Sequence, residues 1–455
     1  MSQYQTLDPT TGELIETYEL ATASEIDAAL DLAAKSFGDW RRLPFAARAA
    51  VLMRAAARLE AQAGELALVA ALEMGKTLAE GEAEVKKCAA ACRFYAERGE
   101  EFLRPVAAES DGSEAWVRYE PLGPVLAVMP WNFPFWQVFR FVAPALAAGN
   151  VAILKHASST PRCALAIGRV LTEAGAPVGV FQNLFLSREQ VSEVIADRRL
   201  RGVTLTGSTR AGREVAAAAG KVLKPMVMEL GGSDPFIIFG DADFDEAVKV
   251  AAQSRCLNAG QSCISAKRFL VEDAIFPRFR DAFVAAMEAK KVGDPRAKGV
   301  DLGPLARKDL REELARQVAA AVAAGAEVLC GGQTPPGPGA FYPPTVLEAL
   351  DPHSPAAQEE LFGPVAAIYP FRGEQAAVAL ANATPYGLGA SLWTADRERV
   401  QRLVPEIEAG SIFVNGLVKS DPRLPFGGVK DSGFGRELAA EGLREFTNVK
   451  TLWIR

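Results

Sequence analysis

The sequence predicts an α/β protein built from two doubly wound domains, because two residue patterns alternate along most of the chain. Short runs rich in β-branched residues alternate with amphipathic helices, which is typical of parallel sheets covered by helices on both faces. The predicted strands of the first series are 151–155 and 202–206, and those of the second are 268–271, 364–368 and 411–414. A chain of 455 residues with 49% hydrophobic composition is also too long for a single core.

The two ends of the chain predict the remaining elements. The first hundred residues should be mostly helical and coat a sheet, with Ser24 as an N-cap and an alanine-rich stretch from Pro44 onward. The segment 115–120 alternates apolar and polar residues, and the C-terminal tail carries Leu452 and Trp453. Strands that would expose such side chains require a partner, so we expect a small additional element built from strands.

Composition and charge exclude several classes of function. A net charge of -6 with 50 scattered basic residues offers no surface for nucleic acid or an anionic membrane. No apolar run reaches about 18 residues and the N-terminus has no basic region, so the cytoplasm is the expected location. Six cysteines without a CxxC pair and only two histidines predict neither a disulfide framework nor a metal site. A GxSxG elbow is also absent, so cysteine and carboxylate chemistry is favoured.

Three residues are candidates for such chemistry. Cys263 lies in the small and polar run 258–264, which favours a nucleophile, although a free cysteine is more often a buried apolar residue. Glu229 follows the apolar run 226–228, where burial should raise its pKa toward the range of a general base. Asn132 lies in a Trp-Asn-Phe-Pro turn and could aim its amide at an oxyanion, the alternative being a residue that only forms the turn.

Residues 206–212 are a candidate site for a phosphate group. This Thr-Gly-Ser-Thr-Arg-Ala-Gly run follows a predicted strand and begins a helix, so Gly207 permits close approach while N–H groups and the Ser208 hydroxyl face an anion. Doubly wound sheets commonly bind nucleotides at such ends of their strands, but the GxGxxG fingerprint is absent. An ordinary helix N-terminus capped by Ser208 is the alternative, and the run by itself leaves both open.

Six motifs in a fixed order make the chain resemble a known family. They are 130–134 (PWNFP), 155–158 (KHAS), 228–232 (MELGG), 260–263 (GQSC), 359–364 (EELFGP) and 425–430 (PFGGVK). With these motifs the chain resembles the NAD(P)-dependent aldehyde dehydrogenase superfamily along almost its whole length. The segments 231–235 (GGSDP) and 430–437 (KDSGFGRE) are similar to the short bacterial succinate-semialdehyde dehydrogenases.

The resemblance implies a division of the chain into three parts. Residues 1–104 and 122–230 would form a cofactor-binding domain, and residues 231–446 a catalytic domain. Residues 105–121 and 447–455 would form oligomerisation strands, because similar strands bridge subunits in this family. A homodimer or a homotetramer is therefore expected.

The same resemblance implies a reaction. An aldehyde, expected to be succinic semialdehyde, would be oxidised to its acid with hydride transfer to NAD(P), through a cysteine thiohemiacetal and a thioester. Cys263 would be the nucleophile, Glu229 the base and Asn132 the oxyanion donor. The alternatives are a dehydrogenase for another short aldehyde or semialdehyde, a CoA-acylating enzyme, a cofactor-independent thioesterase, and a catalytically silent protein. Glu229 argues against the CoA-acylating enzyme, and the intact dinucleotide motifs argue against the thioesterase.

Cofactor contacts also follow from the resemblance. The residues expected around the ribose, the pyrophosphate and the nicotinamide are Trp131, Lys155, His156, Ser158, Gly207, Ser208, Leu230, Glu360 and Phe362. Many NAD-preferring relatives carry glutamate at the position of Ser158, which would repel a ribose 2'-phosphate, whereas serine beside Lys155 leaves room and a donor for it. NADP is therefore expected to be preferred, with NAD tolerated.

The residues after the Asn132 turn suggest how the aldehyde is held. Trp136 and Arg140 are four residues apart on the expected helix, so they share one face that could line the aldehyde tunnel. Arg140 could receive a carboxylate at the far end of a short semialdehyde, and Ser420 could add a hydroxyl donor. The alternative for Arg140 is a structural ion pair.

Overall fold

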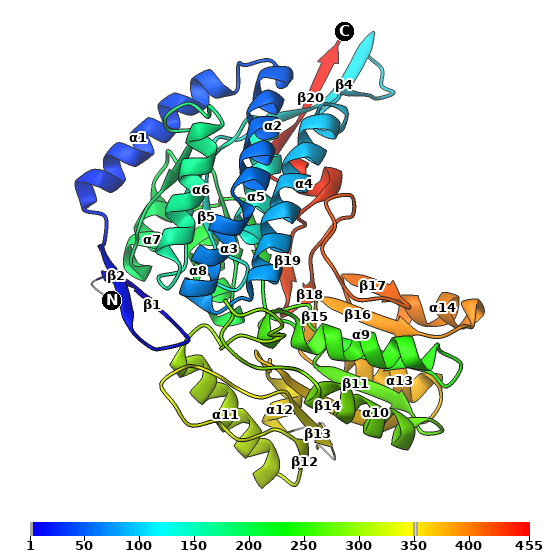
Figure 1. Ribbon diagram of the computed structural model, residues 1–455. Coiled ribbons are helices and arrows are strands. Elements are labelled where there is room, and N and C mark those ends of the chain that lie inside the picture. Colours follow the sequence, from blue (N-terminus) through cyan, green and yellow to red (C-terminus); the bar gives the residue numbers. More distant parts are fainter. Residues whose placement is uncertain (1–2, 349–350, 352–353) are drawn as a thin grey trace.

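The computed structural model describes residues 3–348, 351 and 354–455, and it consists of two α/β lobes and a protruding arm (Figure 1). The upper lobe contains a six-stranded sheet and the lower lobe a seven-stranded sheet. Helices cover both sheets, and the arm carries the C-terminus at its tip. The predicted fold class is confirmed.

The sheet of the upper lobe is parallel except at one edge. Its strands are, in spatial order, β19 (Gly433–Phe434), β9 (Met226–Glu229), β8 (Gly202–Thr206), β5 (Pro124–Val128), β6 (Val151–Lys155) and β7 (Phe181–Asn183). Strands β6 and β8 coincide with the predicted strands at 151–155 and 202–206. All of β8 is buried, as expected for a strand covered on both faces.

A hairpin and the first eight helices of the described chain belong to this lobe. They are β1 (Gln3–Leu7), β2 (Leu14–Glu19), α1 (Ala23–Trp40), α2 (Phe45–Ala61), α3 (Ala63–Met74), α4 (Leu78–Phe102), α5 (Trp136–Ala148), α6 (Pro161–Glu173), α7 (Arg188–Ala196) and α8 (Thr209–Lys221). Helix α1 is capped by Thr22 and not by Ser24 as predicted. The Thr22 hydroxyl accepts from the Glu25 N–H while the Glu25 carboxylate accepts from the Thr22 N–H, which satisfies two backbone donors at once.

The sheet of the lower lobe is parallel except between its first two strands. Its order is β12 (Glu327–Cys330), β13 (Thr345–Glu348), β14 (Val365–Phe371), β11 (Arg268–Glu272), β10 (Pro235–Ile238), β16 (Gly389–Trp393) and β17 (Ser411–Val414). The helices of this lobe are α9 (Phe244–Cys256), η1 (Leu257–Gly260), α10 (Phe276–Glu288), α11 (Lys308–Ala323), α12 (Pro355–Gln358), α13 (Glu374–Asn382), α14 (Arg397–Leu403) and η2 (Val404–Glu406). Strands β11, β14 and β17 are close to the predicted strands of the second series.

The arm is a three-stranded antiparallel sheet that projects from the upper lobe (Figure 1). Strand β20 (Thr447–Ile454) pairs with β4 (Glu114–Pro121) along its whole length, and β3 (Val106–Ala107) covers part of the other edge of β4. The side chains of Leu452 and Trp453 are exposed, at 39% and 48% of their surface. The expected strand-built element is therefore present, and its role in joining subunits stays a prediction.

The segment before β20 rejoins the upper lobe, which differs from the predicted catalytic domain ending at residue 446. Strand β19 pairs antiparallel with β9, and helix α15 (Ala439–Arg444) packs on α4 and α5. Gly433 has φ of +107°, and a Cβ there would lie 1.9 Å from the Met228 carbonyl oxygen, so only glycine fits this crossing. The short strands β15 (Tyr386–Gly387) and β18 (Val429–Lys430) pair with each other in a separate two-stranded antiparallel sheet.

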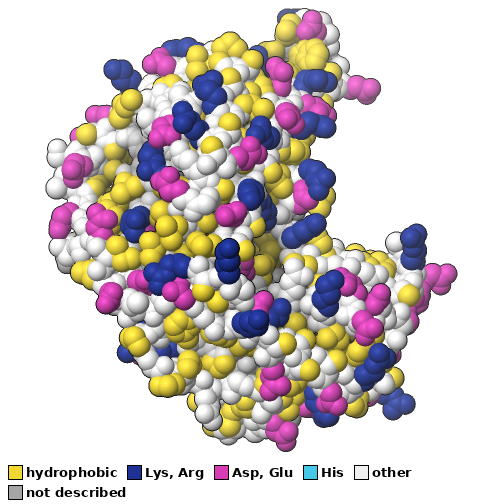
Figure 2. Space-filling model, in the orientation of Figure 1, with side chains coloured by type: hydrophobic (Ala, Val, Ile, Leu, Met, Phe, Trp, Pro, Cys, Tyr) yellow, Lys and Arg dark blue, Asp and Glu magenta, His cyan; other side chains and the backbone are white. Residues whose placement is uncertain are grey.

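The surface is hollowed between the lobes. Figure 2 shows a notch at the right edge of the molecule, between the lobe that contains α4 and the lobe that contains α14 and β17, with Lys and Arg side chains along its margin. In the described part of the chain, no helix is long and apolar enough to cross a membrane.

Candidate active site

The upper sheet brings four predicted site residues to one edge. Trp131 follows β5, Lys155 ends β6, Gly207 follows β8 and Leu230 follows β9, and these four strands are neighbours in the sheet. Because all four strands are parallel, their carboxyl ends lie at the same edge, where doubly wound sheets bind nucleotides. The geometry of this edge therefore suits a dinucleotide.

A strained turn carries Cys263 toward this edge. Asn258 and Ala259 in η1 have φ of 54° and 52°, in the left-handed region that such residues rarely adopt. The turn is held from two sides, because the buried Arg255 guanidinium donates to the Ala266 carbonyl at 3.0 Å and the Asn258 N–H donates to Glu80 at 2.7 Å. A backbone that costs energy to hold is typical of a functional site.

A buried lysine fixes the carbonyl groups around the nucleophile. The Lys267 amine donates to the backbone carbonyls of Ser262 at 2.9 Å, Cys263 at 2.8 Å and Ser265 at 3.1 Å. It also lies 3.5 Å from the Glu360 carboxylate. All three ammonium donors are therefore used to hold one loop, and the neighbouring carboxylate offsets the buried charge.

The Cys263 thiol is held in its neutral form. Burial and, to a smaller extent, the Glu360 carboxylate raise the pKa of this thiol to about 12, although Lys267 and Arg140 oppose them. The residue is half-buried. Nucleophilic attack therefore requires a group that takes the proton.

The Asn132 turn is tied to the nucleophile loop. The Asn132 amide donates to the Gln261 carbonyl at 3.1 Å, and the Asn132 carbonyl accepts from the Asn258 amide at 2.8 Å. An amide NH₂ has two donors, so one N–H of Asn132 remains for a reacting oxygen. The structure thus brings Asn132 and Cys263 into one unit although their elements belong to different lobes.

A buried glutamate on α4 anchors the same turn. One oxygen of Glu84 accepts from the backbone N–H groups of Phe135 and Trp136, both at 2.8 Å, at the start of α5. The other oxygen forms an ion pair with Lys76, whose amine also lies 3.9 Å from the centre of the Phe133 ring. This acceptor at a helix N-terminus fixes where α5 begins, and with it the position of Asn132.

Glu229 ends β9 inside a cluster of buried charges. Burial raises the pKa of its carboxyl, the Arg140 guanidinium 3.7 Å away opposes that rise, and the Glu437 carboxylate adds to it. Burial likewise raises the pKa of Glu437, which forms its own ion pair with Arg140. One guanidinium between two carboxylates leaves the cluster ready to bind one further proton.

This cluster favours the ion-pair alternative for Arg140 over a role in receiving a substrate carboxylate. Its guanidinium contacts both glutamates, donates to the Thr206 hydroxyl at 3.2 Å and lies 4.9 Å from the Phe426 ring centre. Its side chain is 2% exposed. The ion-pair alternative describes the observed contacts, because an incoming carboxylate would first have to displace one of these partners.

Two predicted cofactor residues have structural partners of their own. His156 is fully buried, and its Nε2 donates to the Pro134 carbonyl at 2.8 Å while its Nδ1 accepts from the Ala157 N–H. Burial lowers the pKa of this imidazole to about 4, so the ring is neutral. His156 thereby links β6 to the Asn132 turn, and its role toward a cofactor stays a prediction. The Gly207 N–H donates to the Glu229 carbonyl at 2.9 Å and is not free for a phosphate.

The other predicted cofactor residues differ in their exposure and contacts. The Ser208 hydroxyl accepts from the Ala211 N–H as the N-cap of α8, which is the alternative interpretation of this run, yet the cap is exposed at a helix N-terminus where anions bind. Trp131 and Phe362 meet edge to face with ring centres 5.7 Å apart. Glu360 accepts from the Gly232 N–H at 3.0 Å. Ser158 is half-buried in the turn after β6, three residues beyond Lys155.

The predicted substrate residues Trp136 and Ser420 meet, and they meet a lysine that the sequence analysis missed. The Trp136 indole N–H donates to the Ser420 hydroxyl at 3.0 Å. The Lys87 amine donates to the same hydroxyl at 2.7 Å and lies 4.1 Å from the Trp136 ring centre. Lys87 lies three residues after Glu84, on the helix face that carries buried polar residues, and this spacing could have identified it.

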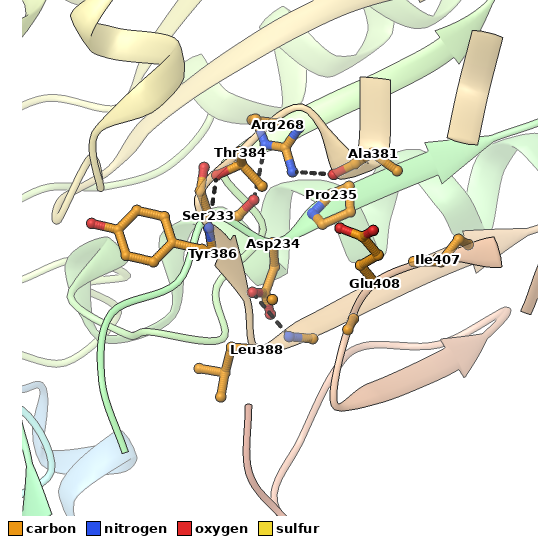
Figure 3. Close-up of a pocket in the computed structure, with 13 residues that line it drawn as sticks. Ser233, Asp234, Pro235, Arg268, Ala381, Thr384, Tyr386, Leu388, Ile407 and Glu408 are labelled. Carbon is orange, nitrogen blue, oxygen red and sulfur yellow. Dashed lines mark hydrogen bonds between the residues drawn. The ribbon is translucent and has the colours of Figure 1, made fainter. Parts of the chain in front are cut away.

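A small cavity elsewhere in the lower lobe is not the reaction site. It lies among Asp234, Arg268, Leu388 and Glu408, where Asp234 accepts from the Gly389 N–H at 3.1 Å (Figure 3). The Arg268 guanidinium donates to the backbone carbonyls of Ser233, Leu380 and Ala381. The cavity has room for about one water molecule, so neither an aldehyde nor a dinucleotide fits there.

Comparisons with known proteins agree with this geometry. The model of the aldehyde dehydrogenase family matches residues 1–452. The chain belongs to the aldehyde dehydrogenase family. It is 50% identical over 449 residues to a probable succinate-semialdehyde dehydrogenase [NADP(+)] of Synechocystis sp., and 50% identical over 452 residues to succinate-semialdehyde dehydrogenase [NADP(+)] 1 of Mycobacterium tuberculosis, with 99% of each chain covered.

Solved structures of the family superpose along the whole chain. A succinic semialdehyde dehydrogenase from Streptococcus pyogenes, in complex with NADP+, is 39% identical with a TM-score of 0.97 and 99% of both chains covered. A succinate-semialdehyde dehydrogenase from Burkholderia pseudomallei is 36% identical with a TM-score of 0.96, covering 99% of this chain and 94% of the other. The chain is thus an enzyme of this family in both sequence and architecture.

The state of the thiol in this enzyme can be tested by alkylation. We expect iodoacetamide to modify Cys263 slowly at neutral pH and about tenfold faster for each further pH unit, because only the thiolate reacts and its pKa is raised. Glu360→Gln removes a charge that raises this pKa, so it should speed alkylation at a fixed pH. Peptide mass spectrometry with Cys263→Ala as control assigns the site. A rate independent of pH, or slower in Glu360→Gln, would contradict this account.

Proposed function

We propose that this chain oxidises succinic semialdehyde to succinate and uses NADP in preference to NAD. The observation that carries the proposal is the convergence of Cys263, Asn132 and Glu229 at the carboxyl edge of the upper sheet. The printed names of the relatives at 50% identity supply the aldehyde and the cofactor. The residues and their contacts supply the steps that follow.

The first step joins Cys263 to the aldehyde. The sulfur forms a bond to the carbonyl carbon, the carbonyl electron pair moves to oxygen, and the thiol proton leaves to a nearby base. The second N–H of the Asn132 amide stabilises the oxyanion, because the first is already held by the Gln261 carbonyl. The amide is therefore oriented before the substrate arrives, and no reorganisation is needed during the reaction.

The cofactor would be held by residues around the edge of the upper sheet. Lys155 and Glu360 suit the ribose hydroxyls, the capped N-terminus of α8 suits the pyrophosphate, and Trp131, Leu230 and Phe362 frame the position of the nicotinamide. When bound there, the nicotinamide supplies a hydride acceptor. At the position of Ser158 a hydroxyl stands instead of a carboxylate, so a 2'-phosphate would meet no repulsion there, and Lys155 would supply a positive charge.

Glu229 acts in the last step, the hydrolysis of the thioester. Its carboxylate takes a proton from water, the hydroxide oxygen bonds to the thioester carbon, and the Cys263 sulfur leaves. Because burial raises its pKa, Glu229 is a stronger base than an exposed glutamate. The ionised, basic form of Glu229 therefore predominates above the raised pKa and is lost as the pH falls below it.

The alternative functions differ in the co-substrates that turnover would require. A CoA-acylating enzyme would release its thioester to a thiol, and a thioesterase would turn over without a nicotinamide nucleotide. A buried carboxylate at the position of Glu229 favours water as the acceptor. A dehydrogenase for another short aldehyde shares every step above and differs only in the far end of the substrate.

We also infer that β20 is covered by a second copy of this chain, as a homodimer or a homotetramer. Leu452, Trp453 and Ile454 are exposed on a strand that projects from the lobe, and such strands require a partner. Light scattering should report a mass that is a multiple of 48.5 kDa, and Leu452→Glu with Trp453→Glu should lower it. A single-chain mass for the unaltered protein would contradict the inference. The cytoplasmic location stays a prediction from the sequence.

The proposed reaction is tested by the absorbance of reduced nicotinamide. With succinic semialdehyde we expect turnover with a higher kcat/KM for NADP than for NAD, and a loss of at least about 10³-fold in Cys263→Ala. Ser158→Glu should reverse the cofactor preference, because a carboxylate would repel the 2'-phosphate. Turnover only with uncharged aldehydes would contradict the substrate, and activity in Cys263→Ala would contradict the nucleophile.

A further inference from the structure

Helix α4 lines the catalytic centre with three polar side chains. Glu80, Glu84 and Lys87 are spaced i, i+4 and i+7, so they lie along one face of the helix. Glu80 accepts from the Asn258 N–H in the nucleophile loop, and Glu84 accepts from the N–H groups at the start of α5. Both glutamates therefore position catalytic elements, which raises the question of what Lys87 does.

Lys87 is a largely enclosed cation without a carboxylate partner. Its amine donates to Ser420 and lies over the Trp136 ring, and within the described residues no carboxylate oxygen comes within 4.0 Å of it. Burial and, to a smaller extent, the Arg140 guanidinium lower the pKa of Lys87 to about 8. Cys88, Glu84 and Asp421 oppose this lowering only in part. The Arg140 guanidinium is already paired with Glu229 and Glu437, whereas the Lys87 ammonium has no such ion pair among the described residues.

A cation kept away from water needs an anion or acceptors to offset the cost of burial. One hydroxyl and one aromatic face use only part of the three donors of an ammonium group. Trp136 begins α5, four residues after Asn132, so the amine contacts the first residue of the helix that follows the proposed oxyanion donor. A ligand anion is the partner that this arrangement lacks.

We propose that Lys87 is the specificity-determining residue for the aldehyde, and that its amine and the Ser420 hydroxyl bind the carboxylate at the far end of the substrate. This inference rests on the proposed function and deepens it by naming the group that selects ω-oxo carboxylates. The Trp136 indole N–H holds the Ser420 oxygen in place, so the hydroxyl proton can turn to the carboxylate. Arg140 does not serve in its place, because Glu229 and Glu437 already occupy its guanidinium.

The test compares two aldehydes of equal chain length. Initial rates of the holoenzyme with NADP are measured for succinic semialdehyde and for butanal, which lacks the carboxylate. Lys87→Met keeps the length of the side chain and removes its charge, and we expect kcat/KM for succinic semialdehyde to fall about 10- to 100-fold, mainly through KM. The value for butanal should stay within about twofold or rise. Lys87→Arg should recover part of the loss.

A neighbouring lysine provides the matched control. Lys86 is exposed on the same helix and pairs with Glu82 at 3.0 Å, so Lys86→Met should leave both aldehydes unchanged. If the unaltered enzyme does not prefer succinic semialdehyde, the proposed function fails, whatever Lys87 does. If it has that preference and Lys87→Met keeps it, only the role of Lys87 is overturned. An equal loss for both aldehydes would also overturn it, because a structural defect affects them alike.

Discussion

The buried carboxylate of Glu84 is the constraint on which the catalytic geometry depends. It holds the N–H groups at the start of α5, which fixes Asn132, and it is itself neutralised by Lys76. Removing either partner of a buried ion pair leaves an uncompensated charge, which typically costs about 3–5 kcal/mol. Because α4 is fixed in this way, the same helix can present Glu80 to the Asn258 N–H and Lys87 to Ser420 and Trp136. One rigid helix thus sets three parts of the site.

Burial also sets the resting charge of the reacting groups. It raises the pKa of the Cys263 thiol and of the Glu229 carboxyl, so the neutral form of each is favoured before substrate binds. The cations Lys267 and Arg140 oppose this: Lys267 donates to the Cys263 backbone carbonyl, and Arg140 lies 3.7 Å from the Glu229 carboxylate. In a site of low dielectric such fixed charges act strongly. We therefore expect the Cys263 thiol to stay neutral at rest, with fixed cations nearby when negative charge develops.

The fold class and the family were predictable because periodicity and short motifs are local properties of a sequence. Polar residues in small or apolar runs, such as Cys263 and Glu229, could be singled out for the same reason. Contacts between distant segments could not be predicted. The sequence suggested a substrate-binding role for Arg140, but its guanidinium is paired with Glu437. It suggested a cofactor contact for His156, whose ring donates to the Pro134 carbonyl. Residues 433–446 return to the upper lobe, where Gly433 packs against the backbone of Met228. Hydrophobic periodicity in the sequence does not reveal such a contact.

We propose that oxidation passes through an acyl group on Cys263, and that Glu229 helps to hydrolyse it. The most direct test is the intact mass of Glu229→Gln, quenched with acid during incubation with NADP and succinic semialdehyde. We expect the added mass of one succinyl group, located on the peptide that contains Cys263, together with one equivalent of reduced cofactor per chain. Reduced cofactor without any acylated protein, or an acyl group on another residue, would contradict it.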